Sequence, residues 1–252
     1  MKKLFFKILF ISFLQSFFVS EAQISQLFRN KDRQERREEQ DSYPYSYGFF
    51  LNMNNFDYKI VLNPNYGIYN KQNLVQSKTT YSFGAGLIGK MRLNDYFDLR
   101  LEPSLQFVDR ELTFDTQNNS SALVLTDADK IRKVKSTYLD VPVMLEFHVD
   151  RWYNSRPYEA GGFNYLMNLQ SNSTSADDNQ QGIFRTTTHN FGWSAEMGIQ
   201  FYFSRFKLTP GFRGTFFFNN ELVSDNASTP PYWAAAMNTV QTRAFMFVLK
   251  FE

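Results

Sequence analysis

The sequence predicts an all-β protein, an eight-stranded antiparallel up-and-down transmembrane β-barrel. Three observations support this prediction: an N-terminal export signal, apolar and polar residues that alternate along many short segments, and connections that are short and long in turn. A transmembrane barrel needs such alternation, because one face of each strand contacts lipid and the other lines the interior.

The export signal occupies the first residues of the chain. Lysines at positions 2, 3 and 7 lie at the start of an apolar segment over residues 4–19, and small residues precede the expected cleavage site after Ala22. A retained membrane helix is the alternative, but three polar residues interrupt the apolar run. No later segment has 18 consecutive apolar residues, so we expect no transmembrane helix in the mature chain.

Composition narrows the class of protein further. The chain has no cysteine, which excludes disulfides, a thiolate metal site and a lipid anchor on an N-terminal cysteine. Loss of the signal peptide would remove three lysines and one glutamate and leave equal numbers of basic and acidic residues, so no nucleic-acid partner is expected. Aromatic residues make up 18% of the chain, with 28 Phe, yet the mean hydropathy is negative because polar residues are interleaved with them.

Period-two alternation defines the predicted strands. Six of them pair as hairpins across short turns, and an early and a last strand complete the eight. Their ranges are 47–56, 82–93, 97–107, 138–149, 156–169, 190–203, 206–218 and 240–251. In the strand 156–169 the period slips around Gly161-Gly162, which predicts either a bulge or a close approach of another backbone.

The connections alternate in length. Long connections rich in Asn, Ser, Thr and Asp cover residues 58–80, 111–133, 170–185 and 219–239, and the other connections are short. This asymmetry is typical of the bacterial outer membrane, where long loops face outward and both chain ends lie in the periplasm. A soluble lipid-binding barrel would show the same alternation inverted, but the signal peptide, the loops and the Phe-rich face favour the membrane. We therefore expect a signal peptide at 1–22, a polar periplasmic segment at 23–44 and the barrel at 45–252.

The predicted inward faces carry charges of both signs. Eight strands leave an interior that side chains fill, and buried charges must be compensated, so we expect a paired network and not an open pore. A proton or ion path is the alternative. The residues predicted to line this network are Lys90, Arg92, Asp98, Arg100, Glu102, Asp140, Glu146, Glu196, Lys207 and Arg213.

Catalytic candidates are few. His148 follows Glu146 on one predicted strand face, a spacing that suits an orienting carboxylate, but no serine is placed beside it, so we interpret His148 as a hydrogen-bonded lumen residue. His189 is expected in an external loop. The sequence contains no phosphate-binding loop and no carboxylate-histidine metal motif, so we predict no catalytic residue, cofactor or metal.

The last long connection contains apolar residues that a solvated loop does not need. Such a segment either folds over the mouth of the barrel or docks on a partner or the lipid interface, and the sequence leaves both open. Its residues include Pro230, Pro231, Tyr232, Trp233 and Met237.

Several motifs along these strands resemble the PorT family of outer-membrane barrels from Bacteroidota. They are Phe83-Gly84-Ala85-Gly86-Leu87, Leu99-Arg100-Leu101-Glu102-Pro103, Tyr138-Leu139-Asp140-Val141-Pro142-Val143 and Arg156-Pro157-Tyr158. The resemblance implies an accessory or assembly role in type IX protein secretion and gliding motility, through contacts with other secretion or outer-membrane proteins, and it supplies no catalytic motif. A lipid-modifying enzyme and a structural or adhesive barrel stay as alternatives.

Overall fold

The computed structural model describes residues 36–63, 75–114, 127–230 and 232–252. The predicted signal peptide and part of the first two long connections lie outside these residues. No helix among the described residues is long and apolar enough to span a membrane. The elements in chain order are η1 (Glu38–Ser42), β1 (Tyr45–Leu62), β2 (Val75–Thr79), β3 (Tyr81–Arg92), β4 (Phe97–Leu101), β5 (Ser104–Phe114), α2 (Asp127–Lys130), β6 (Ile131–His148), β7 (Ser155–Asn168), η3 (Asn179–Gln181), β8 (His189–Tyr202), β9 (Lys207–Phe217), η4 (Ala234–Ala236) and β10 (Met237–Phe251).

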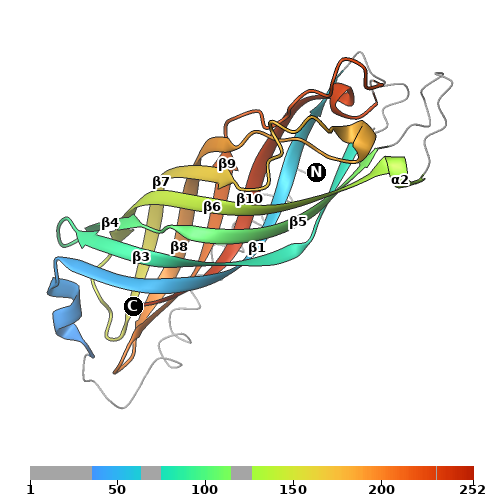
Figure 1. The fold of residues 1–252 in the computed structure, drawn as a ribbon. Coiled ribbons are helices and arrows are strands. Elements are labelled where there is room, and N and C mark those ends of the chain that lie inside the picture. Colours follow the sequence, from blue (N-terminus) through green and yellow to red (C-terminus); the bar gives the residue numbers. More distant parts are fainter. Residues whose placement is uncertain (1–35, 64–74, 115–126, 231) are drawn as a thin grey trace, which may run out of the picture. The chain divides into compact units, whose positions relative to one another are not determined.

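The ten strand segments form one antiparallel sheet in which eight strands lie side by side, because two of the strands are each divided into two segments (Figure 1). β2 and β3 are separated only by Thr80, and β4 and β5 only by Glu102-Pro103. The hydrogen-bonded circuit closes, because β1 pairs with β10 on one side and with β3 on the other. The predicted all-β up-and-down architecture is therefore confirmed.

Alternation along each strand separates an inner from an outer face. On β8 every second side chain from Asn190 to Glu196 is buried, and the residues between them, among them Phe191, are exposed. The outer face is rich in aromatic side chains, such as Phe163, which is 75% exposed, and Phe212, which is 67% exposed. This sheet buries polar residues and exposes aromatic ones, the reverse of a water-soluble sheet.

Several strands extend further into the long connections than predicted. β1 continues to Leu62, β2 lies inside the predicted loop 58–80, and β6 begins at Ile131. Toward these ends the outward positions change from apolar to charged and inward apolar residues such as Leu112 and Phe114 replace polar ones, so the alternation in hydropathy reverses while backbone pairing continues. Asp57 of β1, for example, forms an ion pair with Arg243 of β10 at 2.5 Å.

Of the two possibilities predicted at Gly161-Gly162, the structure does not have the bulge. β6 and β7 pair without a break from Tyr138↔Asn168 to His148↔Tyr158. The close backbone approach, which was the other possibility, is present: a Cβ on Gly162 would lie 2.0 Å from the carbonyl oxygen of Val143. Gly162 therefore interrupts the inner pattern because no side chain fits there.

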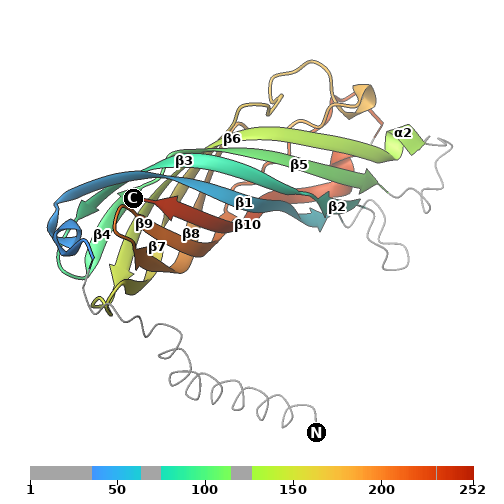
Figure 2. The same cartoon turned by 90° about the horizontal axis from the view of Figure 1, so that it is seen from below.

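Short and long connections alternate as predicted. The short turns cover residues 93–96, 149–154 and 203–206, and the long connections cover 63–74, 115–130, 169–188 and 218–236. Figures 1 and 2 show α2 and η3 at the end of the sheet with the long connections, and η1 at the end with the short turns. We call these the long-loop end and the short-turn end.

Candidate functional site

A network of buried ion pairs fills the middle of the interior. Arg100 Nη2 lies 2.7 Å from Glu196 Oε1, and Arg213 Nε lies 2.7 Å from Glu196 Oε2. Lys250 Nζ lies 2.8 Å from Glu102 Oε1, and Arg213 also binds Glu102. These five residues come from different strands or strand ends, and each is less than 5% exposed. The network thus ties together opposite parts of the closed sheet.

Most of the remaining predicted network residues lie nearby on the inner face. Glu146 binds Arg100 and accepts a hydrogen bond of 2.6 Å from Gln200. Asp98 lies 3.1 Å from Lys90 Nζ, and Lys207 lies 2.9 Å from Glu252.

Two predicted residues stand apart from these ion pairs. Asp140 is buried, but its Oδ1 accepts a hydrogen bond from Asn164 Nδ2 at 3.1 Å. Arg92 is not part of the network at all: its guanidinium forms an ion pair with Asp95 at 2.5 Å in the turn after β3, where Asp95 is exposed. Arg92 is the last residue of β3, so the nearest carboxylate is the one supplied by the turn.

Three important charged residues are missing from the prediction. Lys250 and Glu252 have the inward parity of the last strand, opposite to its Phe residues, and this parity is the signal that would have found them. Arg110 lies further along β5, where its guanidinium carbon is 3.7 Å from the ring centroid of Tyr58 and its Nη1 donates to Thr242 at 3.2 Å. Like Glu102, Arg110 points inward according to the alternation along the strand. It lies beyond the predicted end of that strand, where the outward residues are polar, so the prediction did not include it.

Asp98, Glu146 and His148 are the one group of described residues whose donor atoms lie close enough to hold a metal ion, within 4.8 Å of one another. Lys90 and Arg100 already bind the two carboxylates. His148 Nε2 faces Asp98 at 3.2 Å, so its closest carboxylate is Asp98 and not the neighbouring Glu146. The geometry fits a compensated lumen cluster better than a metal centre.

The other histidine borders a long connection. His189 is the first residue of β8, directly after the connection 169–188. Its Nδ1 is 2.7 Å from the hydroxyl of Tyr165, and the two rings stack.

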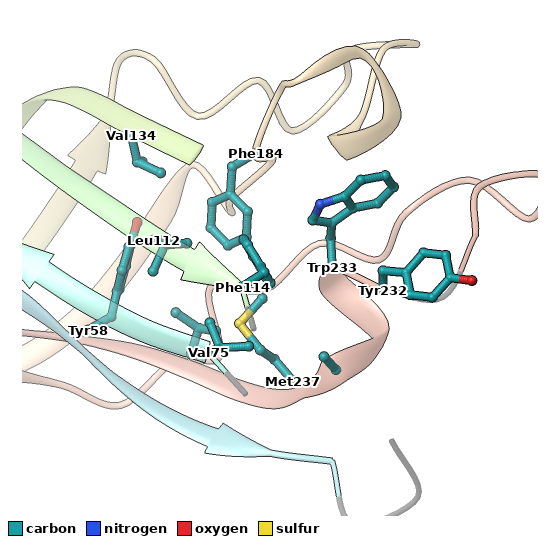
Figure 3. Packing of buried hydrophobic residues seen from close by; sticks show 11 residues of the cluster. Tyr58, Val75, Leu112, Phe114, Val134, Phe184, Tyr232, Trp233 and Met237 are labelled. Atoms are coloured by element: carbon teal, nitrogen blue, oxygen red, sulfur yellow. The ribbon is translucent and has the colours of Figure 1, made fainter. Parts of the chain in front are cut away.

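An apolar cluster fills the long-loop end. Figure 3 shows Phe184 and Trp233 from two long connections beside Val75, Leu112 and Phe114 from the strands. Trp233 is 4% exposed, and its indole N–H donates to the carbonyl of Asp129 at 2.9 Å. Of the two possibilities for the last connection, the structure has the first, in which the loop folds over the mouth. Pro231 lies outside the described residues.

Asp178 joins the two long connections 169–188 and 218–236. Its carboxylate accepts hydrogen bonds from Thr229 Oγ1 at 2.6 Å, from the backbone N–H of Asn226 at 2.8 Å and from that of Gln180 at 2.9 Å. Desolvation opposes ionisation, but these hydrogen bonds, with Arg185 nearby, hold the pKa of Asp178 below its ordinary value of 3.8. We call this arrangement the loop lock.

The short-turn end is covered by residues 36–43. Asp41 accepts a hydrogen bond of 2.7 Å from the hydroxyl of Tyr202, and its carboxylate lies 3.4 Å from Arg151 and 3.5 Å from Arg156. Arg37 donates to the backbone carbonyl of Glu252 at 3.2 Å. The described interior is therefore occupied at its middle and at both ends.

A closed antiparallel sheet with an aromatic outer face and a charged, filled interior is the architecture of an outer-membrane β-barrel. The chain belongs to the family described as outer membrane protein beta-barrel domain, whose model matches residues 33–223. The protein is accordingly located in the outer membrane.

Solved outer-membrane proteins are similar to the chain at low identity. OprG from Pseudomonas aeruginosa is 11% identical with a TM-score of 0.42, covering 81% of this chain and 93% of that one. Neisserial surface protein A is 11% identical with a TM-score of 0.38, covering 83% and 97%. AlkL is 12% identical with a TM-score of 0.38, covering 81% and 88%. No curated protein sequence matches the chain.

Proposed function

We propose that this protein is a non-enzymatic outer-membrane barrel that acts through contacts with other proteins, as an accessory or assembly component of type IX secretion and the associated gliding motility. The filled interior is the observation that carries the proposal. Charged side chains occupy the middle and packed segments cover both ends, which leaves the outer surface as the place for function. The resemblance to the PorT family supplies the particular secretion system.

The proposal includes an orientation and a set of partners. The long loops face outward, the short turns and both chain ends face the periplasm, and the partners are outer-membrane lipid and other secretion or outer-membrane proteins. No nucleic acid takes part.

Cysteine labelling tests the orientation, because the chain contains no cysteine of its own. A membrane-impermeant maleimide should label Thr174→Cys, in a long connection, on intact cells. Arg205→Cys, in a short turn, should be labelled only after lysis. The opposite pattern would reverse the orientation.

Deletion of the gene tests the function. We expect type IX substrates to disappear from the culture medium and gliding to stop, with both restored by the wild-type gene. Normal export and gliding in the deletion strain would contradict the proposal.

A His148→Ala variant tests the absence of enzymatic activity. Lys90 still pairs with Asp98 in this variant, so we expect full restoration of export and an unchanged lipid A mass spectrum. A change in lipid A in the deletion strain, reproduced by His148→Ala, would indicate a lipid-modifying enzyme.

A further inference from the structure

One carboxylate points outward from the barrel among apolar neighbours. Glu159 lies on the exposed face of β7, paired across the sheet with Phe147 and Met197. Its carboxylate forms no hydrogen bond or ion pair among the described residues. The other charged side chains on the outer face of the described strands lie toward the long-loop end; they are Asp57, Lys59, Lys78, Asp109, Glu111, Lys133, Lys135 and Arg243.

Glu159 lies at membrane depth. It is four residues from the start of β7 at the short-turn end, and a tilted strand therefore raises it about 10 Å above the turn. The turn carries Trp152 and Tyr153, both 52% exposed, which are typical of the membrane interface. A carboxylate above this aromatic level faces hydrocarbon, where leaving it without a partner is unfavourable.

Glu159 also borders a groove. Gly161, Ala195 and Gly214 are direct cross-strand neighbours, so three adjacent strands lack large side chains along one row of the outer face. A groove of about 1040 Å³ follows this row, and Glu159, Met197 and Phe212 lie along one side of it. Residues 159 and 163, on either side of Gly161, are about 13 Å apart along the strand, which matches the 10–12 Å diameter of a helix.

We propose that this groove docks a membrane-embedded segment of a partner protein that presents a lysine or arginine to Glu159. The inference rests on the proposed function, because it names the surface through which the barrel contacts its partner. The negative charge of the Glu159 carboxylate favours a partner group with a positive charge. The amine of a phospholipid headgroup belongs at the level of the aromatic turn, about 10 Å away, whereas a basic side chain on a transmembrane segment reaches the depth of Glu159.

Variants can fill the groove or remove its charge without disturbing the barrel. A Cβ on Gly161 would have no neighbour closer than 3.9 Å, so Gly161→Leu should fold and occupy the groove with an apolar side chain. Gly89 on β3 is equally open, with its nearest atom also at 3.9 Å, and lies outside the groove, so Gly89→Leu is the matched control. Glu159→Leu removes the charge and Glu159→Gln keeps only the hydrogen-bonding amide.

The test is photo-crosslinking in living cells of the full-length protein with a benzophenone amino acid at Met197 in the groove, and at Leu87 on β3 as the control position. We expect Met197 to cross-link to a membrane segment containing a lysine or arginine, identified by mass spectrometry. The yield should fall about tenfold or more in Glu159→Leu and Gly161→Leu, stay unchanged in Gly89→Leu, and recover when Glu159→Lys is combined with a partner lysine changed to glutamate.

Two results would overturn the docking site: a Met197 adduct that contains only phospholipid, or a protein adduct whose yield does not depend on Glu159.

The export phenotypes of these strains also separate the docking site from the proposed function. Loss of export on deletion together with normal export in Glu159→Leu and Gly161→Leu would contradict the docking site and leave the proposed function standing. Normal export on deletion would contradict the proposed function, while the cross-link still decides whether the groove is occupied.

Discussion

Arg213 illustrates how the interior holds charge, because its guanidinium is shared by Glu102 and Glu196. Replacing it by methionine keeps much of the volume but leaves two buried carboxylates with one cation fewer. We expect Arg213→Met to lower the free energy of unfolding by about 3–5 kcal/mol, as measured by denaturant titration in detergent. The control is Arg92→Met, which removes an exposed ion pair and should cost no more than about 1 kcal/mol. Equal losses in the two variants would contradict the network.

Gly161 and Gly162 are adjacent but face opposite environments. A Cβ on Gly162 would lie 2.0 Å from the carbonyl oxygen of Val143, whereas a Cβ on Gly161 would have its nearest neighbour at 3.9 Å. We expect Gly162→Ala to destabilise the barrel by about 1–3 kcal/mol through overpacking, and Gly161→Ala to be close to neutral. The same denaturant titration measures both variants, and a neutral Gly162→Ala would show that the two strands can separate locally.

The alternation of side chains along a strand shows which charged residues point inward, but it does not show which residues they pair with. Arg100 and Glu196 could be placed on the inner face from alternation alone, since their neighbours along the strand are apolar. Their contact could not be predicted, because the two residues are 96 positions apart and meet only when the sheet closes. Arg92 has the same parity as Lys90 but lies at the strand end, where a turn carboxylate competes successfully.

The long connections form a packed element, and the loop lock is sensitive to pH. The pKa of Asp178 is lower in the folded protein than its ordinary value of 3.8, so its contribution to stability is complete above that pH and is lost as the pH falls through the folded pKa. We expect hydrogen exchange of the Asn226 and Gln180 amides, corrected for intrinsic rates, to accelerate below pH 3.8.

The matched control for the loop lock is Asp178→Asn, which keeps an acceptor oxygen but does not titrate. Its amide exchange should be faster than that of the wild type at about pH 5 and should change little down to about pH 3. Exchange in the wild type that also shows no acceleration over this range would contradict a role for the Asp178 charge.

Element boundaries were predicted well only where apolar side chains face outward. The hairpins near the short turns combine an apolar outer face with a polar inner face, and their strands are found at about the predicted positions. Toward the long-loop end the pattern reverses, because charged side chains such as Lys135 and Asp109 lie on the outer face and apolar side chains such as Leu112 and Phe114 lie on the inner face, although the ladder continues. The fold over the mouth was left open for a similar reason, since burial of Trp233 depends on Phe184 and Leu112 from distant segments.

At the scale of the whole molecule, three successive barriers lie along the barrel: the packed mouth, the central ion-pair network and the segment containing Asp41. We therefore expect the purified protein in planar lipid bilayers to show no steady ion current, with a 16-stranded porin as the positive control.

The double variant Asp178→Ala, Trp233→Ala opens only the first barrier, so it too should show no steady current, while its loops become sensitive to protease. Steady conductance in the double variant alone would mean that the mouth, and not the central network, closes the barrel. Steady conductance in the wild type would mean that the interior conducts and that function through the lumen must replace function at the surface.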